Sequence, residues 1–150
     1  MQPQQHKPVW QLPRDASPKC VGFRVRQLSR VVSSIYDEKF APLKLKVSQF
    51  NILSVLSRGG PCVASELCTR IRMDKSTASR NLQRMRRRGW ISAIESKGGR
   101  GQQVSLTPKG IRVMRDAYPL WKKAQQEAIR RLGPEGVKAL KTVLQKVTTR

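Results

Sequence analysis

The chain has 150 residues, of which 31 are Lys or Arg and 9 are Asp or Glu, so its formal net charge is +22. A charge of this sign and size attracts polyanions, either nucleic acids or acidic membrane surfaces. No apolar run approaches the roughly 20 residues of a membrane-spanning helix, and the N-terminal residues lack the apolar region of a secretory signal. We therefore expect a soluble cytoplasmic protein with one domain, since domains commonly have about 100–200 residues.

Few residues are suited to catalysis or metal binding. The chain has one histidine, His6, and neither a glycine-rich phosphate loop nor a nucleophile elbow. Its three cysteines, Cys20, Cys62 and Cys68, are odd in number, which favours a reducing compartment over a disulfide framework. They form no zinc-finger spacing with His6. These features predict a protein that is not an enzyme and that has no metal or cofactor.

The N-terminal part is predicted to be a flexible arm followed by one long helix. Residues 1–17 are rich in Gln and Pro, a composition typical of flexible segments. From Pro18 to about Phe40, apolar residues recur at a helical spacing over four turns, and Pro42 ends the pattern. The residues of this stripe are Val21, Val25, Leu28, Val32 and Ile35.

Two short helices are expected next. The first begins near Ser48, a residue type favoured as N-cap, and ends at the glycine pair before Pro61. The second runs from about Val63 to Arg72, and Cys62 falls in the exposed loop before it. The residues expected to pack inward are Phe50, Leu53 and Leu56 from the first helix and Leu67, Cys68 and Ile71 from the second.

The segment from Met73 to Arg88 is predicted to be a short basic helix with one apolar side. Ala78, Leu82 and Met85 share a face at positions i, i+4 and i+7, with Asp74 or Ser76 as the cap and Gly89 as the stop. The other side carries donors for phosphates or base edges, namely Lys75, Ser76, Thr77, Arg80, Arg84 and Arg87. The run Arg86-Arg87-Arg88 is either a solvated helix end or a set of phosphate contacts.

The next residues alternate like a β-hairpin, with residues 97–101 as the turn and cations at Lys97 and Arg100. A basic helix followed at once by a basic hairpin is typical of a winged helix-turn-helix. In that arrangement the helix enters the major groove of DNA and the wing enters the minor groove. The expected fold is mainly α (α+β), with this winged helix at about residues 45–107.

Two more helices are predicted at the C-terminal end. Thr107 and Pro108 form a strong helix start, and Gly133-Pro134 separates a helix that ends near Leu132 from one that ends near Val147. Their apolar stripes consist of Ile111, Tyr118, Trp121, Ala128 and Leu132, and of Val137, Leu140, Leu144 and Val147. These stripes exceed what one small core needs, so we expect the helices at about 18–40 and 108–148 to form a homodimer.

The chain resembles the MarR (multiple antibiotic resistance) family of regulators over about residues 20–148. The order and spacing of several segments carry this resemblance: Arg26-Gln27-Leu28-Ser29-Arg30, Tyr36-Asp37, Ala41-Pro42-Leu43, Ser48-Gln49-Phe50, Asp74-Lys75-Ser76-Thr77-Ala78-Ser79-Arg80, Arg88-Gly89-Trp90-Ile91 and Leu106-Thr107-Pro108-Lys109-Gly110. The resemblance implies a bacterial homodimer that binds pseudo-palindromic operator DNA. Such proteins usually repress transcription and are released by a small ligand or by oxidation.

Carried over residue by residue, the family's DNA-reading positions fall on Ser76, Thr77, Ser79, Arg80 and the wing residue Arg100. The wing departs from the usual Asp-x-Arg-Asp-x-Arg pattern, because the corresponding residues are Glu95-Ser96-Lys97-Gly98-Gly99-Arg100. Loss of the second acidic residue predicts a more mobile wing. The presumed dimer lobe is also basic, so we expect nonspecific DNA binding that depends steeply on salt.

Three further interpretations remain open. Relatives bind aromatic acids or drugs between their lobes, so Tyr36, Phe40 and Trp121 are candidates for the lining of a pocket for a small anionic aromatic ligand. Cys20 lies where some peroxide-sensing relatives keep a reactive thiol, which would make the protein a redox switch. The alternative to an operator-reading regulator is a nonspecific architectural or RNA-binding protein that uses charge alone.

Overall fold

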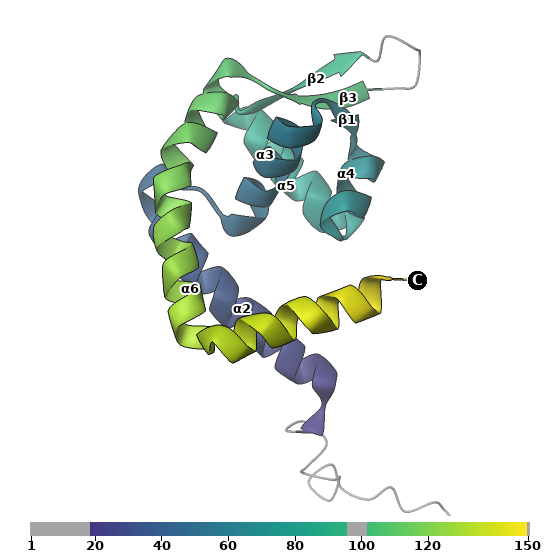
Figure 1. Cartoon of the computed structure of the whole chain (residues 1–150). Helices are drawn as coiled ribbons and strands as arrows, with labels where there is room; N and C mark the ends of the chain where they lie inside the picture. Colours follow the sequence, from purple (N-terminus) through teal and green to yellow (C-terminus); the bar gives the residue numbers. More distant parts are fainter. Residues whose placement is uncertain (1–18, 96–101, 150) are drawn as a thin grey trace, which may run out of the picture. The chain divides into compact units, whose positions relative to one another are not determined.

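The structure is a computed structural model, and it describes residues 19–95 and 102–149 (Figure 1). The chain divides into two compact units, Met1–Ser34 and Ile35–Arg150. The elements, in chain order, are α2 (Val21–Phe40), the 3-10 helix η2 (Ala41–Leu43), α3 (Val47–Gly59), β1 (Cys62–Val63), α4 (Ala64–Ile71), α5 (Lys75–Arg87), β2 (Ile91–Glu95), β3 (Gln102–Leu106) and α6 (Pro108–Thr148). The predicted fold class, mainly helical with a small hairpin, is confirmed.

Among the described residues, the first unit contains the N-terminal part of α2. Its apolar side chains are largely exposed, with 73% of Val21, 60% of Val25 and 52% of Val31 accessible. The predicted helix is present, but within this unit it has no core of its own. The flexible arm expected at residues 1–17 lies outside the described residues.

The second unit is a winged helix. A three-stranded antiparallel sheet of order β1-β3-β2 closes one end of the helices α3, α4 and α5 (Figure 1). The hairpin register pairs Ile91 with Leu106 and Glu95 with Gln102. The core between these layers is made of large apolar residues, of which Phe40, Ile52, Leu53, Leu67 and Met85 are fully buried.

The start of α3 differs from the prediction. Ser48 lies inside the first turn, and the N-cap position is Lys46. The Gln49 side-chain oxygen accepts a hydrogen bond from the Lys46 amide at 3.1 Å, and an Asp37 carboxylate oxygen accepts one from the Val47 amide at 2.7 Å. Side chains from the helix and from the end of α2 therefore satisfy the orphan donors, so a serine cap is not needed.

Cys62 also differs from the prediction. It lies in β1, is 2% exposed and pairs with Val104 of β3, so it is a core residue and not part of an exposed loop. Burial raises the pKa of its thiol, and the nearby Glu66 carboxylate raises it further. A two-residue strand has too little periodicity to be detected in a sequence.

The helix α6 is two helices in series. Thr107 caps the first, since its hydroxyl oxygen accepts a hydrogen bond from the Gly110 amide at 3.0 Å. Gly133, with φ 68°, breaks the helix in the left-handed region that favours glycine, and the chain changes direction there (Figure 1). Both the predicted start and the predicted break are confirmed.

The packed face of α6 was predicted correctly only in part, since Ala128 is buried and Trp121 packs against the core as expected. The buried residues are small, namely Gly110, Ala117, Ala124 and Ala128. Ile111 and Tyr118, expected on the inner side, are 50% and 53% exposed. Close approach explains the choice of small residues, because a Cβ at position 110 would lie 2.0 Å from the Trp90 carbonyl oxygen.

Candidate nucleic-acid interface

The helix α5 presents a buried apolar face and an exposed polar face. Ala78, Leu82 and Met85 are 2%, 5% and 0% exposed, as their spacing predicts. The opposite face carries the exposed side chains Lys75, Ser76, Ser79, Arg80, Arg84 and Arg87, whereas Thr77 is half-buried. All these residues were predicted as DNA contacts, and the structure brings them onto one helix of 13 residues.

Asp74 organises the first turn of α5. One of its carboxylate oxygens accepts hydrogen bonds from the Ser76 hydroxyl at 2.7 Å and from the Thr77 amide at 2.8 Å. These bonds favour the charged form and hold the pKa of the carboxyl well below its usual range. Of the two caps that the sequence allowed, the structure therefore has Asp74, and Ser76 is held by it.

Arg80 lies over this first turn. One of its terminal nitrogens is 3.5 Å from the Ser76 hydroxyl oxygen and 3.5 Å from the Thr77 hydroxyl oxygen. These contacts are long, so the guanidinium keeps most of its five donors available to an acceptor outside the protein. Hydroxyls and a guanidinium gathered in this way suit the recognition of base edges as well as phosphates.

A second group of side chains on α5 borders a hollow beside α4. The hollow has a volume of about 520 Å³ and is lined by Ala64, Ser65, Cys68, Lys75, Ala78, Ser79, Leu82, Gln83 and Arg86. Ser65 and Gln83 were not predicted as site residues. The four-residue step from Ser79 to Gln83 is the signal that would have pointed to Gln83.

Arg88 does not belong with its neighbours Arg86 and Arg87, which are exposed. Its guanidinium carbon lies 4.7 Å from the centroid of the Trp90 ring. The same side chain donates a hydrogen bond to the carbonyl oxygen of Lys44. Arg88 therefore joins the end of α5 to the residues after η2, whereas Arg86 and Arg87 are the exposed members of the run.

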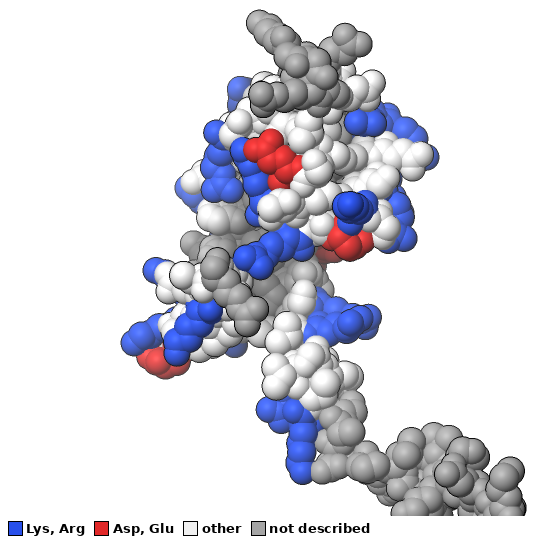
Figure 2. Space-filling view, turned by 90° about the vertical axis from the view of Figure 1, so that its right-hand side faces the viewer, with Lys and Arg blue, Asp and Glu red and all other residues white. Residues whose placement is uncertain are grey.

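The wing can be followed only at its base. The predicted contacts Lys97 and Arg100 lie outside the described residues. On the described surface, Lys and Arg side chains are spread widely and Asp and Glu form only small spots on the face shown in Figure 2. The basic character predicted from composition is thus distributed over the surface and not confined to α5.

The three aromatic residues predicted to line a pocket do not share one. Phe40 is 0% exposed in the core, and the Tyr36 hydroxyl donates a hydrogen bond to the Gln125 side chain. Trp121 alone lines a cavity of about 520 Å³. The other lining residues are Phe50, Asn51, Ser54, Val55, Ser57, Arg58, Arg70, Ile71, Met114 and Tyr118.

The remaining cysteines occupy different environments. Cys20 is exposed and precedes α2 in the first unit, whereas Cys68 is half-buried. Among the described residues, no group of three or more His, Cys, Asp or Glu side chains is placed to hold a metal ion. No helix in the described part of the chain is long and apolar enough to cross a membrane.

Comparison with known proteins agrees with this geometry. Residues 43–100 match the model of the MarR family. The transcriptional regulator PecS of Dickeya dadantii is 27% identical over 101 residues, which cover 65% of this chain and 61% of PecS. The chain thus spans about three fifths of the length of the curated relatives that it matches.

Two solved structures show the same fold. A mutant of Escherichia coli MarR complexed with operator DNA has a TM-score of 0.78 at 22% identity, with 90% of this chain and 98% of that chain covered. BpsR of Bordetella bronchiseptica, solved to explain regulation of its DNA binding by 6-hydroxynicotinic acid, has a TM-score of 0.77 at 22% identity, with 88% and 96% covered. Residues 43–100 are thus similar to the MarR family, and the described part of the chain has the fold of these two solved structures.

Proposed function

We propose that this protein is a transcriptional regulator that binds a pseudo-palindromic DNA operator as a homodimer and represses transcription until a small ligand releases it. The observation that carries the proposal is the cluster of Ser76, Thr77 and Arg80 on the exposed face of α5. Short hydroxyl side chains contribute little to charge neutralisation, but they recognise bases and phosphates at fixed positions. The relative solved with operator DNA supports the same use of this fold.

The exposed apolar side chains support a homodimer. In the first unit they are Val21, Val25 and Val31. In the last part of α6 they are Val143, Leu144 and Val147, which are 57%, 60% and 65% exposed. Apolar stripes of this kind are stabilised when a second copy covers them. A dimer would also place two copies of α5 about one DNA turn apart.

The cavity beside Trp121 supports regulation by a ligand. The Tyr118 and Trp121 rings are stacked, with centroids 5.8 Å apart and planes inclined by 13°. Arg58 and Arg70 also line the cavity, and Arg70 is paired with Glu66 at 2.5 Å. An aromatic wall beside the Arg58 guanidinium suits a planar anion. The solved relative regulated by 6-hydroxynicotinic acid is consistent with such a ligand.

The test is selection of DNA by the full chain from a pool of random duplexes. We expect enrichment of an inverted repeat whose half-sites are about one helical turn apart. A pool that stays random after selection would contradict the proposal and favour an architectural protein that binds through charge. For the redox alternative, Cys20→Ser is compared with the unchanged protein: release of the selected duplex by peroxide from the latter alone would assign the switch to Cys20.

A further inference from the structure

A second basic surface lies on α6, on the face that points away from the core. It consists of Arg112, Arg115, Lys122 and Lys123, which are all exposed, and we refer to it as the α6 stripe. At about 100° per residue these side chains project opposite the buried Gly110, Ala117 and Ala124. The helix α3 packs against both α5 and α6, and the stripe lies on a different helix from the exposed polar face of α5.

In the described part of the chain, no carboxylate forms an ion pair with a cation of the stripe. Lys122 lies 4.8 Å from the centroid of the Tyr118 ring, which leaves its charge uncompensated. Arg112 and Arg115 are three residues apart and repel one another, and the exposed Asp116, four residues from Arg112, forms no ion pair with it. An external polyanion would relieve this repulsion.

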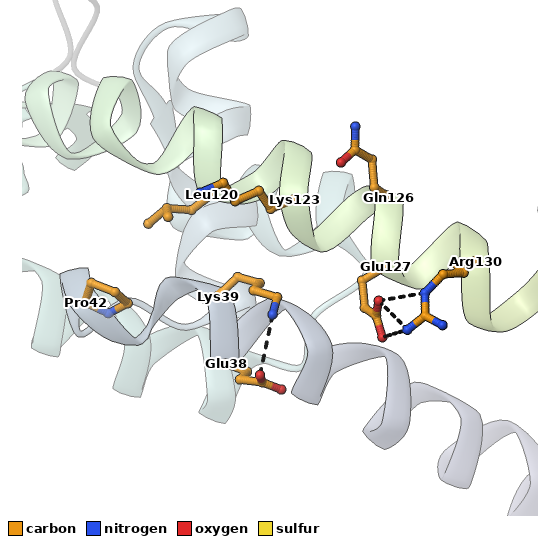
Figure 3. Close-up of a pocket in the computed structure, with 8 residues that line it drawn as sticks. All are labelled: Glu38, Lys39, Pro42, Leu120, Lys123, Gln126, Glu127 and Arg130. Atoms are coloured by element: carbon orange, nitrogen blue, oxygen red, sulfur yellow. Dashed lines mark hydrogen bonds and ion pairs between the residues drawn. The ribbon is translucent and has the colours of Figure 1, made fainter.

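The stripe continues into a groove between α6 and the end of α2. The groove has a volume of about 590 Å³ and is lined by Glu38, Lys39, Pro42, Leu120, Lys123, Gln126, Glu127 and Arg130. In Figure 3, Lys39 and Arg130 are each joined to a carboxylate, Glu38 at 3.5 Å and Glu127 at 2.7 Å, but no interaction reaches Lys123. Lys123 is therefore the cation in the groove that is available to an external anion.

We propose that the α6 stripe is a second binding surface for the backbone of double-stranded DNA, so that the protein holds one duplex through α5 and another segment of duplex through α6. This inference rests on the proposed function for its first duplex. The stripe extends over about 16 Å, at roughly 1.5 Å per residue. Double-stranded DNA carries one negative charge per about 1.7 Å of its axis, so several phosphates can lie along the stripe.

Other polyanionic partners fit less well. A helix that lies in a membrane surface needs an apolar face free to enter the lipid, next to its cations. The small residues of α6 from Gly110 to Ala128 are packed against the protein, and the large apolar side chains beside the stripe are two half-exposed ones, Ile111 and Tyr118, which is little apolar surface to enter a membrane. The stripe also carries no hydroxyl or amide side chain among its four members, so it suits phosphates in general and no particular sequence.

The test is capture of a second duplex. Full-length protein is bound at limiting amount to an immobilised duplex of selected sequence, and a labelled duplex of unrelated sequence is added. We expect the unchanged protein to retain the label, and Arg112→Gln/Arg115→Gln/Lys123→Gln to retain about tenfold less or lower, because three phosphate contacts are lost. Lys138→Gln/Lys141→Gln/Lys146→Gln removes the same charge from the end of α6, which belongs to the proposed dimer lobe, so the oligomeric state of this variant is checked first, and it should retain clearly more label than the stripe variant.

The proposal is overturned if the unchanged protein retains no label, if the stripe variant retains as much as the unchanged protein, or if both variants lose it equally. Binding to phosphatidylserine vesicles that needs the stripe, without capture of the second duplex, would instead assign a membrane partner. The immobilised duplex is scored separately. If it is bound no better than a shuffled one, the proposed function fails, and the stripe variant must then still bind the unrelated duplex about tenfold more weakly than the charge-matched control.

Discussion

The helices α5 and α6 are both rich in Lys and Arg, but their cations have different surroundings. On α5, Arg80 lies beside the hydroxyls of Ser76 and Thr77, and Asp74 fixes the first turn. On α6, the stripe has charges alone. Charge brings a protein to any duplex, whereas fixed short polar groups distinguish one sequence from another. We therefore expect α5 to recognise a DNA sequence and α6 to attract DNA of any sequence.

The stripe stays exposed only if the opposite face of α6 is packed against the core. The substitution Gly110→Ala is expected to disturb this packing most. The added Cβ would lie 2.0 Å from the Trp90 carbonyl oxygen, so backbone must move. We expect a loss of about 1–3 kcal/mol or more in the free energy of unfolding, measured by denaturant unfolding. The control is Gly136→Ala on the same helix, where the nearest side-chain atom is 3.5 Å away. This control should be neutral or slightly stabilising, and equal losses for the two variants would contradict the account.

Replacing Arg80 should reduce the preference for the selected DNA sequence and leave most of the nonspecific binding to DNA. For Arg80→Ala we expect a loss of about 1–3 kcal/mol in binding of the selected duplex, the typical contribution of a side chain that contacts a base edge. Binding to a shuffled duplex should fall much less. Arg112→Ala on α6 is the control, and it should not reduce the affinity for the selected duplex more than the affinity for the shuffled one. The measurement is equilibrium titration of both duplexes at one salt concentration, and an equal loss on both duplexes for Arg80→Ala would show that Arg80 contacts only phosphate.

Arg87 and Arg88 are adjacent in the sequence but should behave differently. Arg87→Gln should lower the slope of log affinity against log salt by about 1, with no change in the melting temperature. Arg88→Gln should leave that slope unchanged and cost about 0.5–1 kcal/mol of stability through its lost contact with Trp90. Salt titrations and thermal melts of both variants decide the matter. A change in slope for Arg88→Gln would place Arg88 in the DNA interface after all.

Asp74 links the order of α5 to pH. Its pKa is lower in the folded protein than in the unfolded chain, so its contribution to stability is complete above the unfolded pKa and is lost as the pH falls toward the folded pKa. We therefore expect Asp74→Ala to melt at a lower temperature than the unchanged protein at neutral pH. The difference should shrink as the pH is lowered below about 4. A difference that is independent of pH would show that the charge of Asp74 does not stabilise the helix.

Much of α5 could be predicted from the sequence, because its features depend on neighbouring residues. The spacing of Ala78, Leu82 and Met85 and the stop at Gly89 each depend on a few neighbouring residues. The cap at Thr107 and the break at Gly133 are local in the same way. Such features can be recognised in a sequence directly, because they do not depend on contacts between distant residues.

The rest depends on contacts between distant residues. In the sequence, Arg88 is one of three consecutive arginines and cannot be distinguished from the other two. Its hydrogen bond to the carbonyl oxygen of Lys44, 44 positions away, distinguishes it in the structure. Tyr36 donates a hydrogen bond to Gln125, 89 positions away, a contact that no sequence pattern indicates. Gly110 of α6 faces the core because the backbone of Trp90 approaches it closely. The prediction had placed the large apolar residues Ile111 and Tyr118 on the inner face, because large apolar side chains give the strongest signal in a sequence pattern.

The central claim is that α5 recognises a sequence while the remaining charge only attracts DNA. The most direct measurement is the ratio of affinities for the selected and the shuffled duplex as the salt concentration is raised. We expect the selected duplex to bind tens-fold tighter and this ratio to persist at about 200 mM salt, because nonspecific contacts weaken steeply with salt. Equal affinities that vanish together would contradict the claim and leave charge as the only basis of binding.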